Sequence, residues 1–110
     1  MYVYTCRVIR VVDGDTCDLE VDIGFRLKIQ DRFRLYGINA PEPTGPDREA
    51  GNRAKVFLQD LVSSHKELTV KTHKDDRGSF GRWLCVLFTP KGENINEMLV
   101  TGGHAQFKTY

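Results

Sequence analysis

The stretch Thr-Cys-Asp-Leu-Glu-Val-Asp-Ile at residues 16–23 alternates polar and apolar side chains at every position. A period of two is typical of a β-strand that buries one face and exposes the other. The turn sequence Asp13-Gly14-Asp15 comes directly before it, and residues 2–12 before that turn are rich in Tyr, Val, Thr and Ile, which favour strands. The start of the chain is therefore predicted to form a β-hairpin.

A third strand is predicted over residues 25–38, with a bend near Gln30-Asp31. Phe33 and Leu35 share one face of this strand, so Arg34 between them points away from the apolar side. Three prolines within residues 39–46 exclude a helix or a central strand and predict a loop.

Two helices and two strands are predicted in the second half of the chain. Apolar residues at helical spacing predict a helix over residues 47–64. Strands are expected over 68–72 and 82–89, and Asn94 is placed to cap a short helix over 95–101. The apolar stripe of the first helix consists of Ala50, Ala54, Phe57, Leu58 and Leu61.

The predicted order is three strands, a helix, two strands and a helix. This order fits a mainly β protein with helices: a five-stranded OB-type barrel with a helix between strands three and four and a short C-terminal helix. An α+β sandwich of another topology would fit the same order. Because 110 residues is close to the commonest domain size, residues 1–110 are expected to form one domain.

The composition narrows the class of protein further. The chain holds 16 Lys and Arg against 15 Asp and Glu, a formal net charge of +1. Neither half is a basic arm, so any nucleic-acid binding is expected to use a local site. No apolar run approaches the ~20 residues of a membrane span, and Arg7 and Arg10 interrupt the first apolar stretch. No membrane partner and a cytoplasmic location are therefore expected.

The three cysteines, Cys6, Cys17 and Cys85, lie in apolar patterns and form no C-x-x-C pair. The histidines have no ligand-like spacing either. Unpaired cysteines behave as small hydrophobic residues, so buried free thiols are expected in place of a zinc site.

Four short segments stand out: D-G-D-T at 13–16, F-R-L at 33–35, N-A-P-E at 39–42 and G-R at 81–82. Each alone has an ordinary explanation, such as a turn or a solvated charge. Together and in this order, they resemble the staphylococcal nuclease-like, or thermonuclease, family. The resemblance covers residues 1 to about 105 and rests on V-V-D-G-D-T at 11–16, R-F-R-L-Y-G-I-N-A-P-E at 32–42, E-A-G-N-R-A at 49–54, F-G-R-W-L at 80–84 and I-N-E-M-L-V-T-G-G at 95–103.

This resemblance implies a calcium-dependent phosphodiesterase that hydrolyses DNA and RNA with little sequence preference. Asp15 matches the first calcium carboxylate, and calcium prefers such oxygen ligands. Asn39 stands where the family usually has a second carboxylate. Ala40 would contribute its main-chain carbonyl, and Glu42 would bind the metal directly or through water.

The resemblance also implies roles in catalysis and substrate binding. Glu42 matches the residue that orients or deprotonates the attacking water. Arg34 and Arg82 match the two arginines that hold the scissile phosphate, since a guanidinium fork binds two phosphate oxygens at once. Phe80 is placed to stack on a base, and Arg77 to add a phosphate contact.

Asn39 departs from the family pattern in a way that matters, because an amide keeps the oxygen but removes a charge. We expect weaker metal binding as a result. An alternative is a catalytically weak or inactive module of the same fold that binds nucleic acid or peptide, and a third possibility is a single-strand-binding OB domain. The expected partner is DNA or RNA, with no obligate protein partner evident, and the small size suits a virus-encoded or bacterial protein.

Overall fold

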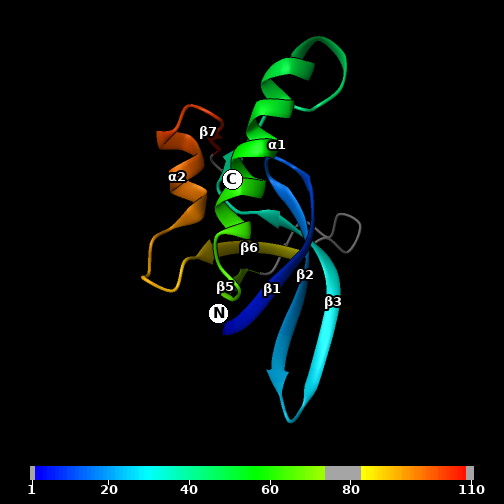
Figure 1. Ribbon diagram of the computed structural model, residues 1–110, viewed down its shortest axis with the longest axis vertical. Coiled ribbons are helices and arrows are strands. Elements are labelled where there is room, and N and C mark those ends of the chain that lie inside the picture. The colour runs from blue at the N-terminus through cyan, green and yellow to red at the C-terminus, as the bar shows by residue number, and fades with distance from the viewer. Residues whose placement is uncertain (1, 74–82, 109–110) are drawn as a thin grey trace.

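A computed structural model describes residues 2–73 and 83–108. Its five long strands close into a barrel in the order β1-β2-β3-β6-β5 (Figure 1). The helix α1 lies between β3 and β5 in the chain, and α2 follows β6, so the predicted OB-type barrel with helices is confirmed. The elements are β1 (Tyr2–Asp13), β2 (Thr16–Gly24), β3 (Leu27–Leu35), β4 (Ile38–Asn39), η1 (Gly45–Asp47), α1 (Arg48–Ser63), β5 (Leu68–His73), β6 (Trp83–Phe88), α2 (Ile95–Thr101) and β7 (Gln106–Phe107).

The barrel closes through one parallel and four antiparallel strand pairs. β1, β2 and β3 form an antiparallel meander, and β5 pairs antiparallel with both β1 and β6. The parallel pair joins β3 to β6, where Phe33 lies opposite Trp83. Parallel neighbours need a long crossover connection, and α1 and β5 supply it here. β4 and β7 form a separate two-stranded sheet that holds the chain after β3.

The apolar residues of the alternating strands fill the barrel. On β2, Cys17, Leu19 and Val21 are buried, and on β3, Phe33 and Leu35 are buried. The helix α1 adds part of its predicted stripe, Ala54 and Leu58, together with Gly51 and Val62.

All three cysteines are free and buried, as predicted. Burial raises the pKa of each thiol, that of Cys6 to about 12. A thiol with so high a pKa is inert at neutral pH, so these residues serve packing.

The predicted caps of α2 are also present. The Asn94 side chain accepts a hydrogen bond from the backbone N–H of Glu97, and Gly102 follows the last residue of the helix. Within residues 2–73 and 83–108, neither helix has the length and apolar character that crossing a membrane requires.

Two predictions about the strands were wrong. The third strand does not continue to Ile38: it ends at Leu35, because Gly37 adopts a left-handed φ of +79° and turns the chain into β4. Ile23 does not share the burial of Cys17 and Val21, because β2 and β3 extend past the barrel as a hairpin arm (Figure 1). Ile23 lies on that arm and is 37% exposed.

Candidate active site

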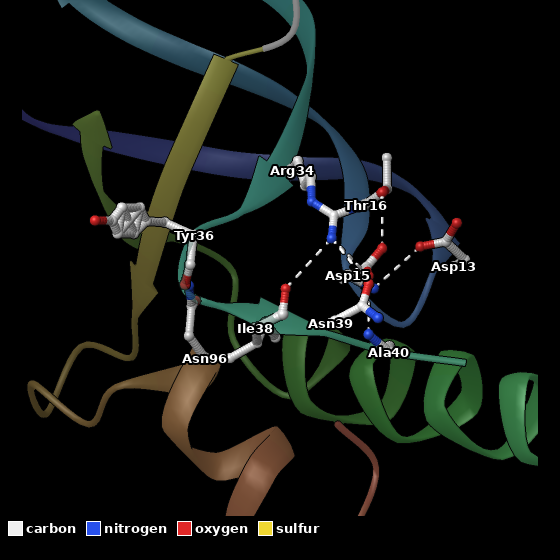
Figure 2. A network of polar contacts seen from close by, with 9 residues as sticks. All are labelled: Asp13, Asp15, Thr16, Arg34, Tyr36, Ile38, Asn39, Ala40 and Asn96. Atoms are coloured by element: carbon white, nitrogen blue, oxygen red, sulfur yellow. Dashed lines mark hydrogen bonds and ion pairs between the residues drawn. The ribbon is translucent and has the colours of Figure 1, made fainter. Parts of the chain in front are cut away.

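The candidate site lies at one mouth of the barrel, where the β1–β2 turn meets the end of β3 and the start of β4 (Figure 2). Asp15 is at its centre and is 5% exposed. Its Oδ2 accepts a hydrogen bond from the backbone N–H of Ala40 at 2.9 Å, and its Oδ1 accepts one from the Thr16 hydroxyl at 3.0 Å. Its backbone carbonyl accepts from the N–H of Leu35 at 2.7 Å. The turn is thereby fastened to both β3 and β4.

Arg34 extends from β3 into the same site. Its Nη2 donates to Asn39 Oδ1 at 3.0 Å and to the Ile38 carbonyl at 3.4 Å, and it lies 3.6 Å from Asp15 Oδ2 (Figure 2). Nε and Nη1 make no hydrogen bond to any residue that the structure describes. The guanidinium is therefore held in place by one nitrogen, and two further donor nitrogens remain for an anion.

A second carboxylate, that of Asp13, stands beside Asp15. The backbone N–H of Asp15 donates to Asp13 Oδ1 at 3.0 Å. Burial raises the pKa of Asp13 to about 6, and the neighbouring Asp15 carboxylate adds to the increase. With Asn39 Oδ1, the two carboxylates form a donor set made only of oxygen, the kind that suits a hard cation such as calcium. Of these two aspartates, the sequence interpretation assigned a metal role only to Asp15, although the D-x-D spacing within one turn was a signal for Asp13 as well.

Two glycines allow the elements around the site to approach closely. A Cβ on Gly14, between the two aspartates, would lie 2.7 Å from Ala54 Cβ and 2.9 Å from Ala40 Cβ. A Cβ on Gly51 of α1 would overlap the backbone carbonyl of Glu42. The turn and the loop after β4 therefore both rest directly on α1. Sequence reasoning missed this role, although Gly51 lies inside the quoted segment E-A-G-N-R-A.

A buried asparagine supports the chain just before β4. Asn96 of α2 is 3% exposed, and its Nδ2 donates to the carbonyls of Tyr36 at 2.9 Å and Cys85 at 3.1 Å. Its Oδ1 accepts from the N–H of Leu87 at 3.2 Å. Asn96 thus joins α2 to β6 and to the turn that leads to Asn39.

The structure brings four of the predicted site residues together: Asp15, Arg34, Asn39 and Ala40. Glu42 follows in the adjoining loop, with an exposed side chain that makes no hydrogen bond or ion pair with a described residue. In the described part of the chain, no three His, Cys, Asp or Glu residues cluster closely enough to hold a metal ion. The predicted residues Arg77, Phe80 and Arg82 lie outside the described residues.

Comparison with known proteins gives one family and several relatives named as nucleases. The family described as "Staphylococcal nuclease homologue" matches residues 32–110. Endonuclease YhcR of Bacillus subtilis (strain 168) is 34% identical over 110 residues, which cover 93% of this chain and 9% of that protein. An uncharacterized endonuclease of Escherichia coli O157:H7 is 34% identical over 99 residues, covering 90% of this chain and 58% of that protein. Thermonuclease of Staphylococcus hyicus is 31% identical over 109 residues, which cover 96% of this chain and 60% of that protein. The chain thus spans less than two thirds of the length of each of these relatives.

Proposed function

The chain belongs to the family of staphylococcal nuclease homologues, and we propose that it is a calcium-dependent nuclease that hydrolyses phosphodiester bonds of DNA or RNA with little sequence preference. The observation that carries the proposal is the position of Arg34 beside Asp15 and Asn39 at the mouth of the barrel. Phosphodiester hydrolysis needs positive charge on the phosphate oxygens and oxygen ligands for a cation. This arrangement offers both within one hydrogen-bonded group.

Arg34 acts on the phosphate in this proposal. Because Nη2 is already bonded to Asn39 and Ile38, the guanidinium is oriented before substrate arrives and does not have to be ordered during the reaction. Its free donors would bind phosphate oxygens and oppose the charge that grows in the transition state. Arg82 is the second phosphate-binding arginine by resemblance to the family. Contacts to phosphate carry no base information, which accounts for the low sequence preference.

The carboxylates hold the metal in this proposal. Asp15 would be the main calcium ligand, with the Asn39 amide oxygen, the Ala40 carbonyl and the neighbouring Asp13 carboxylate as further oxygen donors. Bound calcium would supply positive charge next to the phosphate. Glu42, two residues beyond Ala40 and exposed at the edge of the site, would orient or deprotonate the attacking water.

The direct test is cleavage of single-stranded DNA and of RNA in millimolar Ca²⁺ or with a chelator. We expect cleavage in calcium and none after chelation. Arg34→Ala should lower kcat about 100-fold or more, as loss of one preorganised charge stabiliser does. The matched control is Arg26→Ala at the exposed tip of the hairpin arm, which should cleave like the wild type. Full turnover by a folded Arg34→Ala variant would contradict the proposal.

One observation favours a second candidate, a nucleic-acid or peptide-binding module with weak or no catalysis. Asn39 is uncharged, and its Oδ1 already accepts a hydrogen bond from Arg34. The same assay separates the two functions. Absence of cleavage at every calcium concentration, together with retained binding of the oligonucleotide, would support the binding module.

A further inference from the structure

A groove with basic walls runs between β1 and the middle and end of α1, on a surface that the candidate site does not use. Its volume is about 630 Å³. Its charged residues are Arg7, Arg10, Lys55 and Lys66, joined by His65, and none of the described residues that line it is acidic. The whole chain holds 15 Asp and Glu against 16 Lys and Arg. A groove lined by four basic side chains and by no carboxylate is therefore much more positive than the average of the chain.

An irregularity in β1 puts its two arginines on the same wall. Arg7 lies opposite Glu20 and Arg10 lies opposite Asp18, with a register shift between Val8 and Arg10. Residues three apart in a regular strand point to opposite faces. The shift leaves Ile9 unpaired as a bulge, which restores the same direction for Arg10 as for Arg7. Both arginines therefore line the groove, while Val8 and Val11 on either side of the bulge keep their side chains toward the core.

The groove also has free cations and an apolar floor. Lys55 and Lys66 form no ion pair with any described residue. Arg7 Nη2 lies 3.3 Å from Glu20 Oε1. Arg10 lies opposite Asp18 on β2, where its charge helps Arg32 to lower the pKa of the Asp18 carboxyl. The bulged Ile9, which is 48% exposed, contributes apolar surface on the β1 side, and Val62 lines the groove on the α1 side. Ammonium and guanidinium groups bind phosphates, and the apolar atoms between them can cover sugars.

The groove leads toward the candidate active site. Ala54 of α1, which packs against Gly14 between the two site aspartates, directly precedes Lys55 in the groove wall. Along β1, the six residue steps from Arg7 to Asp13 span roughly 20 Å at ~3.3 Å per residue. A strand in stacked, helical form rises ~3.4 Å per nucleotide along its axis, so about six stacked nucleotides cover that length, and fewer do so in an extended strand.

We propose that this groove binds the phosphodiester backbone of a nucleic-acid strand several nucleotides away from the bond that lies at Arg34. The inference rests on the proposed nuclease function for the identity of the strand, and on charge complementarity for the site. With this second contact, the enzyme favours substrates long enough to reach both the groove and Arg34 over fragments of a few nucleotides.

The test measures binding without cleavage. A fluorescently labelled single-stranded DNA 30-mer is titrated in EDTA at 50–200 mM salt, with anisotropy as the readout. The double variant Arg10→Gln/Lys55→Gln removes two groove cations. The matched control, Arg26→Gln/Lys91→Gln, removes two exposed cations from the hairpin arm and the turn after β6. Thermal unfolding of each variant checks that the fold is kept.

For single strands, each phosphate contact adds ~0.7 to the slope of log affinity against log salt. The groove variant should therefore lose about 1.4 of that slope, so the ratio of its Kd to the wild-type Kd should be about sevenfold larger at 50 mM salt than at 200 mM. The control should keep the slope and Kd of the wild type. An unchanged slope in the groove variant, or an equal loss in the control, would overturn the proposal.

A cleavage assay distinguishes this inference from the function on which it rests. The ratio of kcat/KM for the 30-mer to kcat/KM for a tetranucleotide should fall in the groove variant, about sevenfold more at 50 mM salt than at 200 mM, and stay constant in the control. If the wild-type protein cleaves neither DNA nor RNA, the nuclease proposal fails. The anisotropy result still decides whether the groove binds the strand.

Discussion

Gly51 contacts the loop that carries Glu42, and for the substitution Gly51→Ala helix propensity and packing predict opposite effects on stability. Glycine inside a helix usually costs about 1 kcal/mol relative to alanine, so Gly51→Ala would ordinarily stabilise the protein. Here the added Cβ overlaps the Glu42 carbonyl carbon and oxygen and the nitrogen of Pro43. The loop would have to withdraw by roughly 1 Å to reach the ~3.5 Å separation of non-bonded carbons.

Overpacking of this kind typically costs 1–3 kcal/mol. We therefore expect Gly51→Ala to lower the free energy of unfolding by about 1–2 kcal/mol in urea titrations, in place of the ordinary gain. A misplacement of 1 Å can cost about 100-fold in rate, so kcat should fall by 10- to 100-fold if Glu42 acts on the water.

The control is Asn52→Ala, an exposed neighbour in the same helix, which should gain a few tenths of a kcal/mol from propensity alone. A Gly51→Ala protein as stable as the wild type or more so would refute the reasoning about the loop contact. A destabilised Gly51→Ala variant with undiminished kcat would instead show that Glu42 does not act in the reaction.

Three further changes test other parts of the site. Asn39→Asp restores a carboxylate and should tighten calcium binding in calorimetric titrations; unchanged or weaker affinity would remove residue 39 from the metal ligands. Glu42→Ala and Arg82→Ala should each lower kcat about 100-fold, and wild-type turnover in either would refute the role assigned to it. Asn96→Ala removes three hydrogen bonds to buried backbone groups, so about 3 kcal/mol should be lost in thermal or urea unfolding; a loss below about 1 kcal/mol would show that water or a shifted chain replaces these bonds.

Local periodicity was enough to predict most of the fold. The first helix was predicted over 47–64 and lies at Arg48–Ser63, and the second was predicted over 95–101 and lies there. Both rest on interactions between residues three or four apart, which the sequence displays directly. The break after Leu35 was missed because Tyr36 and Ile38 favour strands, and nothing local distinguishes a glycine with positive φ from one in a strand.

The exposure of Ile23 was missed for a different reason. Alternation shows that one face of a strand is apolar, but it does not show where the strand leaves the barrel. Ile23 lies on the arm because β2 and β3 stay paired beyond the last layer of the core. The length of that pairing is a property of the assembled sheet.

The candidate site was predictable only in part. The direction of Arg34 followed from its place between Phe33 and Leu35, while the other site residues came from family resemblance. The closeness of Asp13 to Asp15 is local, and the D-x-D spacing indicated it. The closeness of Gly51 to Glu42 depends on how α1 packs against the loop after β4. That contact joins residues with no shared periodicity, so no pattern within one segment indicates it.

The basic groove shows most clearly what a net charge of +1 conceals. Its four Lys and Arg come from β1, from the middle of α1 and from the residues after α1, segments about fifty residues apart in the chain. Outside the groove, the remaining formal charges of the protein sum to −3. A polyanion is attracted to the groove and repelled on average by the rest of the surface, and such a field orients a charged ligand as it approaches. A balanced composition therefore favours one docking direction, whereas a uniformly basic protein would bind the strand in many.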